Sequence, residues 1–261
     1  MSKTLQLLSL LRRHPREFYE RVATGVESRW EQARLQGPKY SVTASRNGIG
    51  LLATALKAEV ARYLNEADVE QLALELQRSI GQLEDAPFAQ YHNGGSLFGR
   101  LCYALVRALR PRNVVETGVC YGISSAHILA ALKGNAQGHL YSIDLPPLGK
   151  NGDAYVGGAI PNELRERWTL QRGSSRKLLP RLAENLGEIG FFVHDSLHTY
   201  DNMQAEFATV WPLLPSRGVL IADDVQGNAA FQELTRRADV AEAVVFQEPS
   251  KGTLFGVAVK R

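Results

Sequence analysis

The chain has few of the features that would place it outside ordinary globular proteins. Only two of its 261 residues are cysteine, Cys102 and Cys120, which argues against a disulfide framework and predicts that both are reduced. The net charge of +3 is too small to indicate a nucleic-acid partner. With 44% hydrophobic and 22% charged residues, the composition argues against a disordered or fibrous chain.

Long hydrophobic runs are also missing. The apolar run within residues 5–11 is too short to span a bilayer and has no small-residue cleavage site before Arg12. We therefore expect a cytoplasmic protein without a transmembrane segment. The basic residues around this run would allow docking on a membrane surface, but packing against the chain's own domain or against a partner subunit, as in a homodimer, is the favoured interpretation.

Two regions differ in their hydrophobic pattern. Residues 1–87 carry apolar residues at helical spacing, most clearly over residues 51–80, and predict an N-terminal helical extension. Over residues 88–261 apolar strands alternate with amphipathic helices. This second pattern predicts an α/β, Rossmann-like domain: a seven-stranded, mostly parallel sheet with helices on both faces.

Seven segments have the composition of strands in this sheet. They are residues 114–117, 140–144, 168–172, 191–195, 219–223, 243–247 and 254–260. The last two follow each other without room for a crossover helix, so we expect them to be antiparallel neighbours at an edge of the sheet.

The most informative stretch is VVETGVCYGISS at residues 114–125, where a buried strand runs into a glycine turn that opens a helix. A ligand approaches the backbone closely only where no Cβ intervenes, so Gly118 and Gly122 indicate a site for an adenosyl cofactor. Glu116 precedes them, and the spacing E-x-G-x-x-x-G departs from the G-x-G-x-x-G of dinucleotide binders. A tight corner without a ligand is the alternative.

Polar residues end the next two strands. LYSID ends in Asp144, where a carboxylate can accept hydrogen bonds from both ribose hydroxyls; a helix cap or turn aspartate is the alternative. The third strand runs into RGSSR, which contains Ser175 and Arg176. Serine or backbone amides there could bond an adenine edge, although such loops also cap helices.

The fourth and fifth strands end in acidic residues. FFVHDSLHTYDN places Asp195 at the tip of the fourth strand, and VLIADDV places Asp223 and Asp224 at the tip of the fifth. Like charges this close are costly unless a cation or a proton lies between them, and magnesium suits such oxygen ligands. The alternative is that these aspartates cap helices and bind water.

Two histidines accompany the aspartates. His198 lies three residues after Asp195, where it could face the same cavity and remove a proton from a substrate hydroxyl at near-neutral pH. His194 lies within the strand and should point away from Asp195 by strand alternation. We therefore expect His194 to be a packed residue.

Taken together, these motifs make residues 91–260 resemble class I S-adenosylmethionine-dependent methyltransferases, specifically the methyltransferase-24-like group with similarity to catechol O-methyltransferase. VVETGVCYGISS resembles the family's first cofactor motif, LYSIDLP its acidic second motif, and WTLQRGSSRKLLPRL its adenine-side segment. FFVHDSLHTYDN and GVLIADDV resemble the segments that supply metal ligands.

The resemblance implies roles for the matching residues. The cofactor-binding set that it implies is Glu116, Gly118, Gly122, Ser124, Asp144, Ser175, Arg176 and Asp195. The glycines would line the methionine moiety with Ser124 beside it, and Asp144 would bind the ribose. Ser175 and Arg176 fall where the family contacts adenine.

The resemblance also implies a metal site and a base. Asp195, Asp223 and Asp224 match its three metal-ligand positions, and Asp224 departs from the asparagine of the catechol enzyme while remaining an oxygen ligand. His198 stands at the position of the catalytic lysine, which keeps a base but changes its reach and pKa. His198 and Asp195 are thus the expected catalytic residues.

We therefore expect an O-methyltransferase that uses S-adenosylmethionine and magnesium and acts on a hydroxyl of a small molecule, such as a sugar, a natural-product scaffold or a phenol. A metal-independent methyltransferase with His198 as base is the closest alternative. A nicotinamide-dependent oxidoreductase and a non-catalytic binding protein are more distant ones. The missing third glycine argues against the oxidoreductase, and the intact acidic cluster argues against the binding protein.

Two further segments are expected to cover the site. The glycine-rich loop at residues 145–161 has the length and position of a lid, with a flexible connector as the alternative. Residues 91–96 precede the first strand, and in the resembling family this region helps to cover the cofactor.

Overall fold

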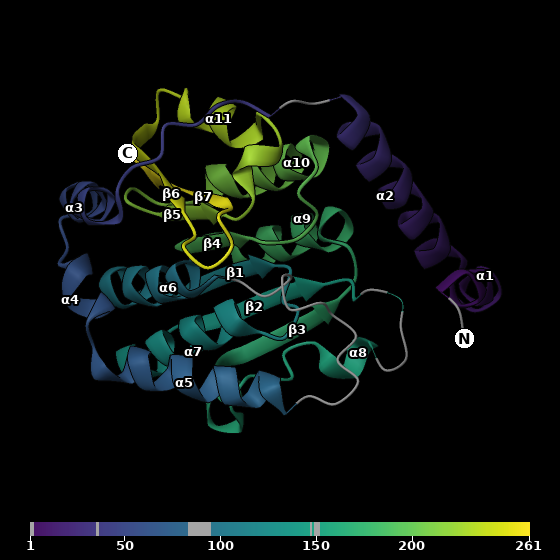
Figure 1. Ribbon diagram of the computed structural model, residues 1–261, viewed down its shortest axis with the longest axis horizontal. Coiled ribbons are helices and arrows are strands. Elements are labelled where there is room, and N and C mark those ends of the chain that lie inside the picture. Colours follow the sequence, from purple (N-terminus) through teal and green to yellow (C-terminus); the bar gives the residue numbers. More distant parts are fainter. Residues whose placement is uncertain (1–2, 35–36, 83–94, 147, 149–151) are drawn as a thin grey trace.

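The computed structural model describes residues 3–34, 37–82, 95–146, 148 and 152–261 (Figure 1). Its centre is a seven-stranded sheet with the order β3-β2-β1-β4-β5-β7-β6. The strands are β1 (Asn113–Thr117), β2 (His139–Asp144), β3 (Trp168–Arg172), β4 (Phe191–His194), β5 (Val219–Ala222), β6 (Val240–Gln247) and β7 (Leu254–Lys260). All seven predicted strands are present, and the predicted Rossmann-like architecture is confirmed.

The edge formed by the last two strands is as predicted. β7 runs antiparallel to β5, and β6 pairs antiparallel with β7. β6 begins at Val240, earlier than the predicted strand, and a register shift separates Val240 from Glu242. Glu242 interrupts the apolar run at the same place as the register shift, which hides these first residues from a pattern based on apolar runs.

Successive side chains of each central strand pack into two separate hydrophobic cores, one on each face of the sheet. Val114 belongs to a core that the helices within residues 45–135 cover, whereas Val115 belongs to a core that the helices within residues 175–235 cover. Phe191 and Phe192 divide in the same way. A strand whose side chains are buried on both faces must be apolar at successive positions, which explains why the sequence pattern of these strands is continuous.

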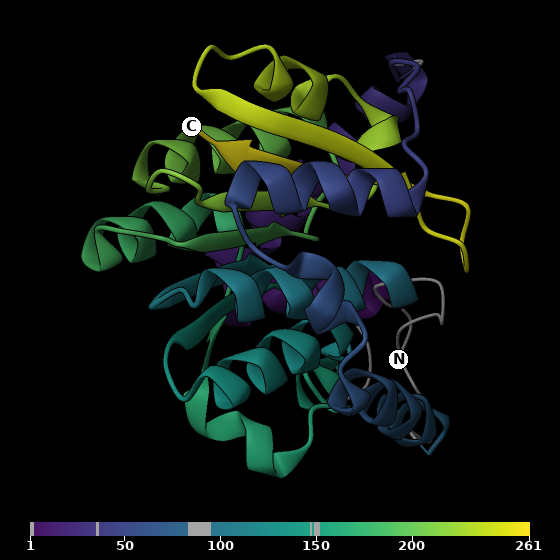
Figure 2. The ribbon, with the colours of Figure 1, turned by 90° about the vertical axis from the view of Figure 1, so that its left-hand side faces the viewer.

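Helices cover both faces of the sheet (Figure 2). On the first face lie α3 (Ser45–Leu56), α4 (Val60–Leu64), α5 (Ala67–Gly81), α6 (Ser96–Leu109) and α7 (Ile123–Asn135). On the second face lie α9 (Ser175–Leu186), α10 (Tyr200–Val210) and α11 (Ala230–Thr235). The helical pattern over residues 51–80 is confirmed by α3, α4 and α5.

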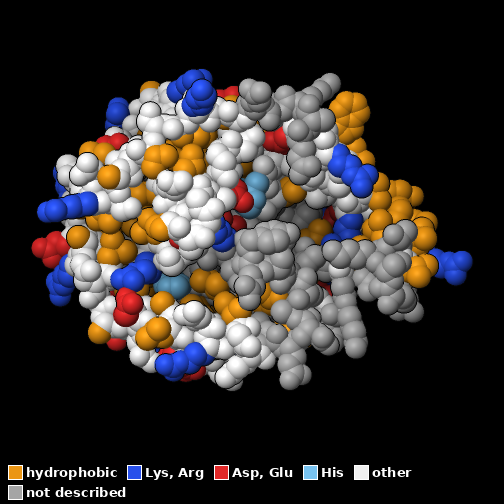
Figure 3. Space-filling view, viewed as in Figure 1, with side chains coloured by type: hydrophobic (Ala, Val, Ile, Leu, Met, Phe, Trp, Pro, Cys, Tyr) orange, Lys and Arg blue, Asp and Glu red, His pale blue; other side chains and the backbone are white. Residues whose placement is uncertain are grey.

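Two helices at the start of the chain, α1 (Lys3–Arg13) and α2 (Pro15–Arg34), lie apart from these layers (Figure 1). One side of α2 faces the strand ends, and its opposite side is apolar and open (Figure 3). The large hydrophobic side chains exposed on the two helices are Leu5, Leu8, Leu11, Tyr19, Val22, Val26 and Trp30. In the described part of the chain, no helix is both long and apolar enough to cross a membrane.

The segments predicted to cover the site are only partly described. Within the 145–161 loop, residues 152–155 form the short helix α8 (Gly152–Tyr155), and Leu145 and Leu148 reach the cavity described below. Residues 147 and 149–151 of this loop lie outside the described residues, as do residues 91–94 of the second segment. Their roles stay predictions.

Candidate functional site

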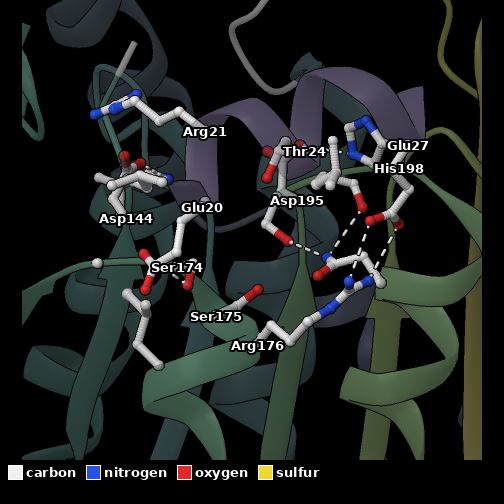
Figure 4. A pocket seen from close by; sticks show the side chains of 18 of the residues that line it. Glu20, Arg21, Thr24, Glu27, Asp144, Ser174, Ser175, Arg176, Asp195 and His198 are labelled. Carbon is white, nitrogen blue, oxygen red and sulfur yellow. Dashed lines mark hydrogen bonds and ion pairs between the residues drawn. The ribbon is translucent and has the colours of Figure 1, made fainter. Parts of the chain in front are cut away.

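A cavity opens where β1 and β4 lie side by side and the strand order reverses. Open α/β sheets bind ligands at this switch point, outside the carboxyl ends of the strands. The cavity has a volume of about 980 Å³ and extends from α2 to the ends of β4 and β5 (Figure 4). The predicted site residues that line it are Gly118, Asp144, Ser175, Arg176, Asp195, His198, Asp223 and Asp224.

The turn after β1 brings two strands into backbone contact at Gly118. Gly118 has φ +83°, and a Cβ there would lie 1.9 Å from the carbonyl oxygen of Asp195. The amide of Asp195 in turn donates to the carbonyl of Thr117 at 2.8 Å. Only glycine fits at this point, because the turn lies directly against the backbone of Asp195. Gly118, Val119 and Cys120 of this turn line the cavity.

Gly122, Glu116 and Ser124 lie behind the cavity wall. Gly122 has φ +87° at the start of α7, and a Cβ there would lie 2.6 Å from Cγ1 of Ile160. The buried carboxylate of Glu116 accepts hydrogen bonds from three hydroxyls: Ser124 at 2.7 Å, Ser125 at 2.6 Å and Ser142 at 2.8 Å. These residues shape the turn from beneath, so direct contact of Glu116, Gly122 and Ser124 with a cofactor stays a prediction.

Burial gives Glu116 an unusual protonation equilibrium. The side chain is fully buried, and desolvation raises its pKa to about 7 even though three serine hydroxyls favour the charged form. The group therefore changes charge near neutral pH inside the structure.

Asp144 ends β2 beside the glycine turn. Its Oδ2 accepts hydrogen bonds from the amides of Val119 at 2.6 Å and Cys120 at 3.1 Å. Burial raises the pKa of Asp144, and the two amides oppose that rise. The carboxylate is thus held against the turn while facing the cavity, the position predicted for a ribose ligand.

Ser175 and Arg176 begin α9 on the same side. Ser175 is buried at the cavity wall. The guanidinium of Arg176 donates two hydrogen bonds of 3.1 Å to the carboxylate of Glu27 on α2 (Figure 4). In this arrangement Arg176 is engaged by α2 at the cavity wall, and its predicted contact with adenine stays a prediction.

His198 lies between two of the predicted aspartates at the other end of the cavity. Its Nε2 is 3.6 Å from Oδ1 of Asp195, and its Nδ1 is 3.5 Å from Oδ2 of Asp224. Burial lowers the pKa of His198, but the carboxylates, Asp195 foremost, outweigh that effect and raise it to about 9. The ring therefore carries a proton at neutral pH and balances part of the acidic charge, so, unlike the expected near-neutral base, it must lose this proton before it can accept another.

Asp223 completes this acidic end. The side chain is buried, and desolvation followed by the charges of Asp195 and Asp224 raises its pKa to about 7. Three carboxylates thus meet one imidazole ring in the cavity, together with Lys251 from the connection between β6 and β7.

The donors at this end suit a hard divalent ion in kind, because carboxylate oxygens are the ligands that magnesium prefers. The carboxylates are not arranged around a common centre, as the ligands of a metal ion would be. Over the residues that the structure describes, no three His, Cys, Asp or Glu side chains converge as they would around a metal ion. The ring of His198 instead lies between Asp195 and Asp224, so the three predicted ligands do not surround a common point in this arrangement.

His194 is a packed residue, as predicted, and it also contacts Glu206 and His198. It is fully buried, and its Nδ1 lies 2.7 Å from Oε2 of Glu206 on α10. Its ring packs edge-on against that of His198, with 5.3 Å between centroids. Burial raises the pKa of Glu206, but the contact with His194 and several hydroxyl donors outweigh it and lower the pKa to about 2.

Helix α2 and Lys251 also line the cavity, although neither was predicted to do so. The residues of α2 that reach the cavity include Glu20, Arg21, Thr24 and Glu27 (Figure 4). The signal available in the sequence was the spacing of four glutamates, which places Glu17, Glu20, Glu27 and Glu31 on one side of a helix. That spacing does not reveal what the acidic side faces.

Comparison with known proteins finds a methyltransferase match for part of the chain. Residues 115–225 match the family model described as a methyltransferase domain. Among solved structures, an O-methyltransferase from Bacillus cereus in complex with SAH superposes with a TM-score of 0.58 at 19% identity, covering 81% of this chain and 99% of that one. No curated protein matches the chain significantly.

Two further solved structures are similar. A putative O-methyltransferase from Klebsiella pneumoniae has a TM-score of 0.55 at 15% identity, covering 76% of this chain and 91% of that one. The O-methyltransferase TomG from Streptomyces achromogenes, in complex with SAM, has a TM-score of 0.54 at 17% identity, covering 75% and 90%. The family-model match bears out the expected methyltransferase resemblance for residues 115–225, and the solved structures, each below 25% identity, show the fold.

Proposed function

We propose that this protein, whose residues 115–225 match the methyltransferase-domain model, transfers the methyl group of S-adenosylmethionine to a hydroxyl of a small molecule. The observation that carries the proposal is the cavity at the switch point. One end of it has the glycine turn and Asp144, as an adenosyl group requires, and the other end has Asp195 and His198, which can handle a proton.

At the cofactor end, the chain's own residues would bind and orient. Gly118 lines the cavity and allows the turn to lie against the backbone of Asp195, and the carboxylate of Asp144 is placed to accept hydrogen bonds from ribose hydroxyls. Bound S-adenosylmethionine supplies an electrophilic methyl group on its sulfonium. Holding that methyl in line with the acceptor oxygen can contribute about 7 to 11 kcal/mol of barrier reduction.

At the reaction end, Asp195 and His198 would receive the proton of the acceptor. As the acceptor oxygen bonds to the methyl carbon and the carbon–sulfur bond breaks, the hydroxyl must lose its proton. The ring of His198 takes that proton after its own has left to solvent, and Asp195, 3.6 Å away, stabilises the resulting imidazolium.

Magnesium assistance is the finer part of this proposal. Asp195, Asp223 and Asp224 would hold the ion, which when bound would favour the ionised form of the acceptor oxygen. The buried, charge-crowded carboxyl of Asp223 supports this version. The metal-independent version is supported by the position of the His198 ring between Asp195 and Asp224.

A titration of chelator-treated protein with magnesium chloride separates the two versions. Heat of binding that disappears in Asp195→Ala, together with turnover that stops in chelator while S-adenosylhomocysteine still binds, supports the metal. Turnover that persists in chelator and in Asp195→Ala would remove magnesium from the mechanism.

The test of the function itself is an isothermal titration with S-adenosylhomocysteine and, in parallel, with NAD. Micromolar binding of S-adenosylhomocysteine alone supports a methyltransferase and justifies screening sugars, natural-product scaffolds and phenols as acceptors. Binding of NAD alone would replace the proposal with an oxidoreductase. Binding of neither ligand favours a non-catalytic scaffold.

A further inference from the structure

We propose that helix α2 helps to position the reaction site: its residues Glu27 and Glu31 hold in place the loop that carries His198. The inference rests on the proposed function, because His198 is the base assigned there. His198 lies in the connection of residues 195–199 between β4 and α10. A group that fixes the start of α10 therefore also fixes the backbone on which His198 stands.

Helix α10 begins without a side-chain cap of its own. Its N-cap residue is Thr199, a residue type whose hydroxyl usually accepts a hydrogen bond from an amide of the first turn. Within the described structure, however, Thr199 makes no such bond. Its hydroxyl donates instead to the carboxylate of Glu27 on α2.

Glu31 supplies the missing cap from outside. The backbone amide of Tyr200, at the first position of α10, donates to both carboxylate oxygens of Glu31, at 2.6 and 2.8 Å. These residues are 169 positions apart in the chain. A carboxylate at a helix N-terminus also meets the positive end of the helix dipole, so the contact combines a hydrogen bond with a favourable charge.

The start of α9 repeats the arrangement. Ser174 is its N-cap and likewise makes no capping bond within the described structure, and its hydroxyl donates to Glu20 of α2 at 3.4 Å. Glu20 also pairs with Lys177 at 3.1 Å, and Glu27 holds Arg176 through two bonds. Two neighbouring helices thus direct their capping hydroxyls to the acidic side of α2.

The contacts of α2 fall into two groups: some only attach the helix to the domain, and others reach the residues next to His198. Glu17, nearer the start of α2, is paired with Arg172 and Arg21 and touches neither α10 nor the loop before it. Glu27 and Glu31 contact Thr199 and Tyr200, the two residues directly after His198. Loosening α2 at Glu17 should therefore differ from cutting the link at Glu31.

The experiment compares Glu31→Ala with Glu17→Gln in the full-length protein. Amide hydrogen exchange is measured over residues 196–203, and the ring signals of His198, assigned with His198→Ala, are followed by NMR. In Glu31→Ala we expect the Tyr200 amide to exchange about tenfold faster or more, because a hydrogen bond to a charged group is lost. We also expect the His198 ring signals to broaden or to split.

Two further variants guard against a folding defect. Glu31→Gln keeps an oxygen acceptor for the Tyr200 amide and should give an intermediate effect. Thr199→Val removes the hydrogen bond from Thr199 to Glu27 but leaves the ion pair between Glu27 and Arg176. This variant should perturb the ring signals of His198 without loosening α9. Glu17→Gln should leave the His198 signals at their wild-type positions.

Unchanged exchange and unchanged ring signals in Glu31→Ala and Thr199→Val would overturn the inference, as would equal changes in Glu17→Gln. These readouts need no methyl acceptor. Titration with S-adenosylhomocysteine is run on the same samples, because its failure in the wild-type protein would refute the proposed function while leaving the link between α2 and α10 measurable. Once an acceptor is found, Glu31→Ala should lower kcat and leave KM for S-adenosylmethionine unchanged.

Discussion

At the scale of the residue, Asp144 combines two tasks in one carboxylate. It holds the glycine turn through the amides of Val119 and Cys120, and it faces the space where a ribose would lie. The sequence predicted the second task, since an acidic residue ended the second strand. The first depends on how the turn folds back, which strand spacing does not reveal.

We expect Asp144→Ala to weaken binding of S-adenosylhomocysteine by about 10- to 100-fold, because hydrogen bonds to a charged group are worth about 1.5 to 3 kcal/mol. Calorimetric titration measures the effect. Asp144→Asn is the matched control, since it keeps an acceptor for the turn amides but loses the charge. Wild-type affinity in the asparagine variant would show that the charge of Asp144 is not needed for binding.

His198 should reveal its acidic surroundings in the metal-free protein. We expect its ring to titrate near pH 9 by NMR, above the ordinary value of 6.5, because Asp195 and Asp224 favour the charged form. Asp224→Asn should move the midpoint down, since one of the two facing carboxylates becomes neutral. A midpoint near 6.5 in the wild-type protein would contradict the placement of the ring between them.

At the scale of the element, the strands of the sheet were predictable from the sequence, but the position of helix α2 at the cavity was not. Strands buried on both faces produce continuous apolar runs, so β1, β4 and β5 were visible in the sequence. Helix α2 was visible only as an amphipathic stretch. Its partners are Arg172, Arg176 and Thr199, brought to it by the tertiary fold, and no local pattern indicates such distant contacts.

The turn between β1 and α7 should be intolerant of any side chain at Gly118. Gly118→Ala combines a left-handed backbone, costing about 1 to 2 kcal/mol, with a clash against the carbonyl of Asp195, costing about 1 to 3 kcal/mol more. Gly187, with φ +69° and open space around its Cβ position, is the matched site. Urea unfolding should show a clearly larger loss in the free energy of unfolding for Gly118→Ala than for Gly187→Ala. Equal losses would mean that β1 and β4 separate easily at this turn.

At the scale of the whole molecule, Glu116 should impose a pH dependence on stability. Its pKa rises from 4.5 to about 7 on folding, so between these values the folded state holds a proton that the unfolded state has released. The free energy of unfolding should therefore decrease as pH rises through this window, by at most about 1.4 kcal/mol per pH unit. It should level off above pH 7.

Urea unfolding of the wild-type protein and of Glu116→Gln between pH 4.5 and 8 tests this dependence. Glutamine cannot titrate, so the decline should flatten in the variant even if its stability is lower at every pH. The same slope in both proteins would assign the pH dependence to other groups. Glu206 acts in the opposite direction and at lower pH, because its lowered pKa stabilises the fold above about 4.5 and that contribution is lost as pH falls toward 2.

The candidate site as a whole was predictable where a strand end alone decides a position. Asp195, His198, Asp223 and Asp224 were expected in one cavity, and the cavity contains them all. What the sequence could not supply was their mutual placement, with the ring of His198 between two carboxylates and Asp223 buried beside them. It also could not show that Glu116 and Ser124 bond to each other behind the turn.

The attachment of α2 by ion pairs has a kinetic consequence. A molecule bound between α2 and the strand ends would be released more readily when α2 lifts, and lifting α2 breaks its pairs with Arg172, Arg176 and Lys177. These pairs are partly exposed, so dissolved salt screens them and the helix lifts more often as ionic strength rises. The residence time of a bound product should therefore shorten in salt, and the rate at which the protein resets for another turnover would then depend on its surface charges.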